Sequence, residues 1–84
     1  KTNFEIVDLD DALDGISSLD VKKWEYIDEP GVKRIGPTSQ DFYSQFGLGE
    51  NDLTISTVDA IGVCMAAIKA LNQKIQQLQS QLSA

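Results

Sequence analysis

The sequence has no histidine, a single cysteine and few basic residues, and each shortage excludes a class of function. Without histidine there is no Ser-His-Asp or Cys-His catalysis, and the ligand of most zinc sites is missing. One cysteine, Cys64, excludes an internal disulfide and a cysteine-rich metal site. The net charge is −6, and such an acidic chain lacks the clustered positive charge that nucleic acids and anionic membranes bind.

Long apolar runs are missing as well. No stretch approaches the roughly 18 consecutive apolar residues of a membrane-spanning helix, and the pattern of the first residues predicts no signal peptide. The acidic run Asp8–Gly15 fails the EF-hand spacing, because Leu13 stands where a ligand is needed. The segment Gly47–Gly49 has no lysine after it, which argues against a phosphate loop. We therefore expect no metal, no cofactor, no nucleic acid and no membrane partner.

What the sequence does contain is a regular apolar repeat near its C-terminus. Apolar residues recur there in alternating steps of three and four, which is the a/d pattern of a coiled coil. The other side of the predicted helix is polar and rich in glutamine. So narrow an apolar stripe needs copies of itself to cover it, and we expect an oligomer. The predicted contact residues are Ile61, Cys64, Ile68, Leu71, Ile75, Leu78 and Leu82.

Two shorter helices are predicted before this repeat. Apolar residues recur at helical spacing from Leu9 to Leu19, where Asp8 or Asp10 is placed to cap a helix that Gly15 keeps short. A second helix is predicted over residues 37–46, because proline suits the first helical position and a glycine follows the end.

A β-hairpin is predicted between these two helices. Residues 21–27 alternate in polarity and are rich in β-forming types, and residues 32–36 would form the return strand. The intervening turn, residues 28–31, has Pro and Gly where a type II turn needs them. Trp24 is expected to be buried against the second helix. Residues 53–55 are a candidate short strand.

The long C-terminal helix is predicted to begin after Ser56, which forms a capping-box pattern with Asp59. Its 26 residues to Leu82 would span roughly 39 Å. Its first part, residues 60–70, is apolar nearly all round, which predicts burial on several faces. The fold class expected is α+β, with a small body over residues 1–56 followed by the helix of residues 57–84. Because the chain begins at Lys1, we expect it to be the C-terminal piece of a larger protein.

Several segments carry a resemblance to a known family. The sequence KRIGPTSQDFY at residues 33–43 resembles the signature of the C-terminal intramolecular chaperone, auto-processing domain of phage tail spikes and tail fibres, of the endosialidase type. Residues 20–26 resemble that family's strand before the turn. Residues 55–59 and 66–71 resemble its entry into the terminal helix, so the resemblance extends over nearly the whole chain.

The resemblance implies a function. Such a domain trimerises three chains of a fibrous protein, aligns them, and cuts itself off with a serine nucleophile and a lysine about five residues after it. The start of the chain, Lys1 to Phe4, is similar to the part of the motif after the serine, so Lys1 is the candidate catalytic lysine. The serine would lie upstream, and this chain alone should not be a peptidase. Arg34 stands where many phage members have histidine, so any role of that histidine is lost or replaced in this chain.

The implied partners are two further copies of the chain and the upstream fibrous domain of the same polypeptide. The implied location is a virion tail precursor made in the cytoplasm of the bacterial host. The domain would be released from this precursor after cleavage. The heptad itself leaves dimer and trimer open, since Ile at a with Leu at d favours parallel dimers whereas the resemblance implies a parallel trimer. The alternative is a permanently attached trimerisation cap that never cuts. A winged-helix DNA-binding module is disfavoured, because residues 38–46 contain no Lys or Arg.

Overall fold

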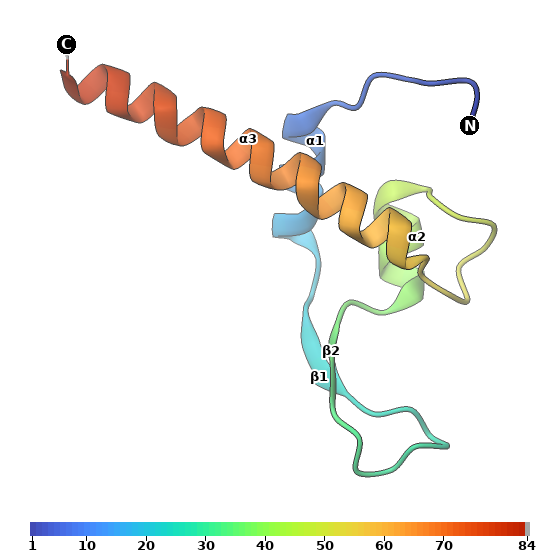
Figure 1. The fold of residues 1–84 in the computed structure, drawn as a ribbon. Coiled ribbons are helices and arrows are strands. Elements are labelled where there is room, and N and C mark those ends of the chain that lie inside the picture. The colour runs from blue at the N-terminus through green and yellow to red at the C-terminus, as the bar shows by residue number, and fades with distance from the viewer. Residues whose placement is uncertain (84) are drawn as a thin grey trace.

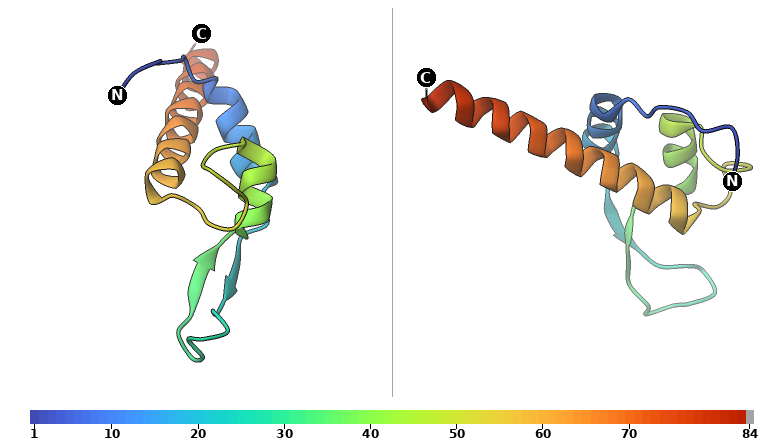
Figure 2. Two further views of the ribbon diagram at one scale, coloured as in Figure 1. Left: turned by 90° about the vertical axis from the view of Figure 1, so that its right-hand side faces the viewer. Right: turned by 45° about the horizontal axis from the view of Figure 1, so that its top comes forward.

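The computed structural model describes residues 1–83 and has three helices and one antiparallel hairpin in that range (Figure 1). The α+β class predicted from the sequence is confirmed. The long terminal helix lies across the first helix and projects well beyond the rest of the chain (Figure 2). In chain order the elements are α1 (Leu9–Ser18), β1 (Lys22–Trp24), β2 (Arg34–Gly36), α2 (Ser39–Phe46) and α3 (Thr57–Ser83).

Helix α1 begins where its capping signal predicted. The Asp8 carboxylate accepts a hydrogen bond from the Asp11 backbone N–H at 3.1 Å, which satisfies a free donor of the first turn. Acidic residues in that turn also suit the positive end of the helix dipole. The buried residues of α1 are Ala12 and Gly15, and their small size allows close approach of neighbouring helices.

Gly15 has a packing role that its sequence context did not indicate. A β-carbon at this position would lie 2.6 Å from Cε1 of Phe46, and that ring packs on Phe42 with centroids 5.0 Å apart. Phe42 is buried and only 4% exposed, so it restricts where the Phe46 ring can move. The contact between α1 and α2 therefore depends on the absence of a side chain at residue 15.

We expect Gly15→Ala to lower the free energy of unfolding by about 1–2 kcal/mol, because overpacking outweighs the gain in helix propensity. Gly62→Ala is the matched control, since it also adds a methyl group inside a helix but meets nothing within 4 Å. That variant should gain roughly 0.5–1 kcal/mol. Urea unfolding followed by circular dichroism measures both. Equal stabilisation by the two substitutions would contradict the packing role of Gly15.

The hairpin has the predicted turn but shorter strands. Val32 N–H donates to the Glu29 carbonyl at 3.2 Å and Gly31 has φ +88°, as a type II turn requires. The register pairs Lys22 with Gly36 and Trp24 with Arg34. The predicted strands of residues 21–27 and 32–36 were too long, because the hairpin points away from the helices and no second layer supports its outer part (Figure 1).

Near the hairpin tip, where the strands no longer pair through backbone hydrogen bonds, the Glu25 side chain connects the two sides. The Glu25 carboxylate accepts hydrogen bonds from the Gly31 backbone N–H and, at 2.7 Å, from the Lys33 ammonium group. The Lys33 ammonium, followed by the Gly31 N–H, lowers the pKa of Glu25 below its usual value, because both contacts favour the charged carboxylate. Glu25 therefore joins both sides of the loop where backbone pairing has ended.

The prediction that Trp24 is a core residue packed on α2 was wrong. Trp24 is half-buried within the hairpin, where its Nε1–H donates to the Gly36 carbonyl at 3.2 Å. Its ring meets Tyr26 edge to face, with centroids 4.9 Å apart. The buried aromatic position is instead Phe42 of α2. A three-residue strand offers too little surface to cover an indole on every side.

Helix α2 begins two residues later than predicted. Thr38 is the N-cap, and its hydroxyl accepts a hydrogen bond from the Asp41 N–H at 3.2 Å, whereas Pro37 precedes the cap. Gly47 ends the helix as predicted, with φ +61° in the left-handed region. The strand predicted at residues 53–55 does not form. The Asn51 side chain instead accepts the Leu53 N–H at 2.9 Å, a local bond that competes with strand pairing.

Helix α3 begins after Ser56 as predicted, but its first part is buried on one face only. The buried residues are Val63, Ala66, Ala67 and Ala70, which lie on the side packed against α1. Met65 is 61% exposed, so the predicted burial on several faces was wrong within this single chain. The body provides only enough surface for one side of the helix. None of the helices among residues 1–83 is long and apolar enough to cross a membrane.

Candidate functional site

The predicted coiled-coil residues form an uncovered apolar strip along α3, which we call the α3 seam. Each of them is exposed, and the exposed fraction of the isoleucines and leucines ranges from 46% at Ile75 to 87% at Leu82. The only cysteine of the chain belongs to this strip and is also exposed. The α3 seam comprises Ile61, Cys64, Ile68, Leu71, Ile75, Leu78 and Leu82.

The α3 seam and the α1 contact lie on different sides of the same helix. Successive residues of a helix turn by about 100°, which places the centre of the buried face roughly 110° from the centre of the seam, with Ala67 at the boundary between the two. The contact with α1 ends at the ion pair between Lys74 and Asp10, whose charged atoms are 3.7 Å apart. Beyond that ion pair α3 continues alone to Ser83 (Figure 1). The intramolecular fold therefore leaves the whole seam available for contact.

The exposed area of the chain is large for its mass. The accessible surface is 6968 Å². A compact monomer of this mass would expose about 4,900 Å² by the usual scaling of area with mass. Roughly 2,000 Å² per chain is therefore in excess, which is in the range that stable protein interfaces bury. Leu71, Ile75 and Leu78 are each about half exposed or more and contribute apolar surface to this excess.

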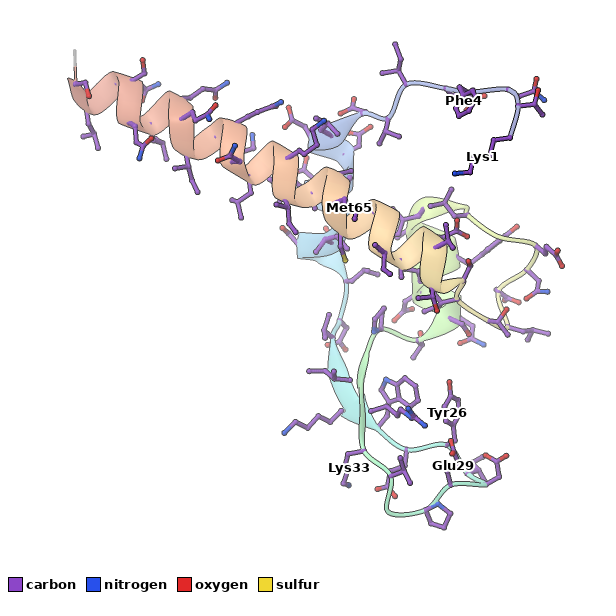
Figure 3. The ribbon with its side chains drawn as sticks, viewed as in Figure 1. Lys1, Phe4, Tyr26, Glu29, Lys33 and Met65 are labelled. Atoms are coloured by element: carbon purple, nitrogen blue, oxygen red, sulfur yellow. The ribbon has the colours of Figure 1, made fainter. Side chains whose placement is uncertain are left out.

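Lys1 lies in the N-terminal segment of residues 1–7, which has no helix or strand and is exposed throughout. In Figure 3 its side chain points back toward the helices rather than outward. The two serines nearest in sequence to a lysine are otherwise engaged. The hydroxyls of Ser17 and Ser18 donate to carbonyls of α1, each at 2.9 Å, and Lys22 pairs with Asp20 at 3.0 Å. Ser17 and Lys22 are five residues apart, a spacing that could suggest a serine–lysine dyad, but each side chain is bound to a different partner.

The family model described as chaperone of endosialidase matches residues 1–47 of the chain, which is more than half of its length. The chain belongs to the chaperone of endosialidase family. The matched part runs from the N-terminal segment through α1, the hairpin and α2, and it includes Lys1 and the Ile-Gly-Pro segment. Helix α3 lies beyond the match, so the wider resemblance remains a prediction there. No curated protein and no solved structure matches the chain.

In this member of the chaperone of endosialidase family, Arg34 lies on β2 and is remote from Lys1. Its guanidinium is 3.6 Å from the Glu29 carboxylate, and it lies opposite Trp24 in the hairpin register. The N-terminal segment and the hairpin extend from opposite ends of the helical body (Figure 3). Arg34 therefore makes its contact within the hairpin, and the fold does not place it in a common site with Lys1. Among residues 1–83, no three His, Cys, Asp or Glu side chains are grouped to hold a metal ion.

Sequence reasoning did not identify a groove that runs between α1, α2 and α3. It has a volume of about 1020 Å³. Its acidic wall comes partly from Asp8, Asp11 and Asp14, whose spacing of three along α1 was a signal that these side chains share one side of the helix. No local pattern in the sequence indicated that α2 and α3 would form the opposite wall of the groove.

Proposed function

We propose that this chain is a C-terminal intramolecular chaperone that trimerises a phage tail spike, tail fibre or similar fibrous protein and is then released by self-cleavage. Membership in the chaperone of endosialidase family supports the chaperone role. The fibrous parent, the trimer and the cleavage are our inference from the family resemblance and from the α3 seam.

The single observation that carries the proposal is the exposed α3 seam. An apolar strip on a helix of 27 residues, about 40 Å long, is costly in water and is covered when parallel copies pack seam to seam. The excess area of roughly 2,000 Å² per chain matches burial against two neighbours. Three parallel seams bring three chains together in one register. The segments that precede each Lys1 are then presented in register too, as a folding template for a fibre would require.

The proposed cleavage would use Lys1 as a general base. A neutral lysine amine takes the proton of an upstream serine hydroxyl, and the serine oxygen attacks a peptide carbonyl. The resulting ammonium returns the proton to the leaving amide nitrogen, and water then hydrolyses the ester. An exposed lysine has a pKa near 10.4 and is a poor base at neutral pH. Assembly that removes water from Lys1 would favour the neutral amine and tie cleavage to trimer formation.

The alternative function is a trimerisation cap that remains attached. It shares the α3 seam with the first proposal and differs only in the absence of cleavage. The residue five positions before Lys1 in the full polypeptide separates the two, since serine there favours cleavage and its absence favours the cap.

We expect the 84-residue chain to sediment as a trimer. At tens of micromolar, sedimentation equilibrium should give three times the chain mass of 9.2 kDa. A dimer would be consistent with the seam as the interface and with the preference of the heptad pattern, but it would contradict the proposed trimer. A monomer at these concentrations would overturn the proposed assembly function.

A further inference from the structure

The groove between the three helices has an apolar floor and an open mouth. Apolar side chains from α2, the following loop and α3 meet there, and none of the α3 residues that line it belongs to the seam. The groove therefore stays accessible when the seam is covered. Its apolar lining from the helices and the loop comprises Ala12, Phe46, Leu48, Val58, Val63 and Ala66.

The charged residues around the groove all have one sign. Asp8, Asp11, Asp14 and Asp59 line it, and no Lys or Arg does. The ion pairs found among residues 1–83 involve other carboxylates. A segment that fits this groove should therefore present an apolar side chain to the floor and a positive charge to the wall.

The N-terminal segment of the same chain carries both an apolar side chain, Phe4, and a positive charge, Lys1, at its far end, together with one negative charge at Glu5. Phe4 and Val7 already line the groove at its edge, and Phe4 is still 83% exposed. Asn3 has φ +52°, which bends the segment. Lys1, two residues before Asn3, lies on the inner side of this bend (Figure 3). No hydrogen bond or ion pair fastens residues 1–7 to the helices within the described chain.

We propose that the groove is the docking site of residues 1–7 of its own chain. In the docked state Phe4 enters among Phe46, Leu48 and Val58, and the Lys1 ammonium lies beside the carboxylate of Asp59. Burial of an exposed phenylalanine supplies the driving force, and the opposite charges fix the direction of the segment. The segment acts as a strap that closes over the groove while the seam holds the trimer.

Docking has a consequence for Lys1 that rests on the proposed cleavage function. A carboxylate beside an ammonium group favours the charged form, which cannot act as a base. The docked strap is therefore a resting state, and the Lys1 side chain must leave Asp59 before it can accept a proton. The acidic groove delays cleavage until the strap is withdrawn.

The first test is methyl NMR on the full 84-residue chain. Phe4→Ala should shift the methyl signals of Leu48 and Val58, because the ring current of the docked phenylalanine is lost. Ile6→Ala is the matched control, since Ile6 lies on the same strap, is fully exposed and does not line the groove. Unchanged methyl signals in both variants would overturn docking. Contacts found only between differently labelled chains would overturn the same-chain occupant and assign the groove to a second copy.

The second test measures cleavage in a longer precursor that contains the upstream residues. Asp59→Asn should speed cleavage several-fold by releasing Lys1. Asp41→Asn is the matched control, because Asp41 also lies in the first turn of a helix but does not line the groove. An equal rate for both variants would overturn the resting state. A precursor that never cuts would overturn the proposed cleavage and leave the NMR result on docking intact.

Discussion

Replacing both Ile68 and Ile75 by Asp is expected to convert the proposed trimer into monomers. Both side chains lie on the α3 seam and are exposed in the single chain, so the variant should still fold around α1. In the proposed trimer each lost isoleucine would remove about 2–5 kcal/mol of stabilisation by burial. The introduced carboxylates would also face like charges from the other chains without a hydrogen-bond partner. The result should be complete dissociation at concentrations where the natural sequence is assembled.

Sedimentation equilibrium and circular dichroism together measure this effect. The mass should fall to that of one chain, and helicity should fall moderately, because the part of α3 beyond Lys74 would lose its only packing partner. The matched control is the double variant Gln73→Asp and Gln77→Asp, which adds the same charge on exposed polar positions outside the seam. If the isoleucine variant stays trimeric, the seam is not the interface. If the control also dissociates, charge alone explains the effect.

The second large effect is expected for Lys1→Arg in the longer precursor. Arginine keeps the positive charge and a similar reach but stays protonated near neutral pH, so it cannot serve as a base. General-base catalysis contributes about 10²–10⁴-fold, and cleavage should slow by that factor. Assembly should be unchanged, because Lys1 lies outside the α3 seam. The two properties should therefore separate in one variant.

Gel electrophoresis over time follows the cleavage, and sedimentation follows the assembly. Lys23→Arg is the matched control, since Lys23 is an exposed lysine of the hairpin. Cleavage of the Lys1→Arg protein at an unchanged rate would remove Lys1 from the mechanism. If the natural precursor assembles and is never cut, the permanently attached cap becomes the function.

Sequence alone determined the elements whose signals are local. The α1 cap, predicted at Asp8 or Asp10 and found at Asp8, the type II turn centred on Pro30 and Gly31, and the start of α3 after Ser56 each depend on a few adjacent residues, and the structure has all three. The heptad spacing also identified the apolar strip, and the structure leaves that strip exposed. Family membership was recognisable from short segments for the same reason, because their residues are contiguous.

Tertiary structure alone decided what depends on contacts between distant segments. It placed Trp24 at the half-buried edge of a hairpin, and it made Gly15 the point where α1 meets Phe46. It also assigned one face of α3 to α1 and formed the acidic groove from three helices. A helical pattern states which residues share a side but not which neighbour covers that side, since the neighbour is chosen by packing across the chain.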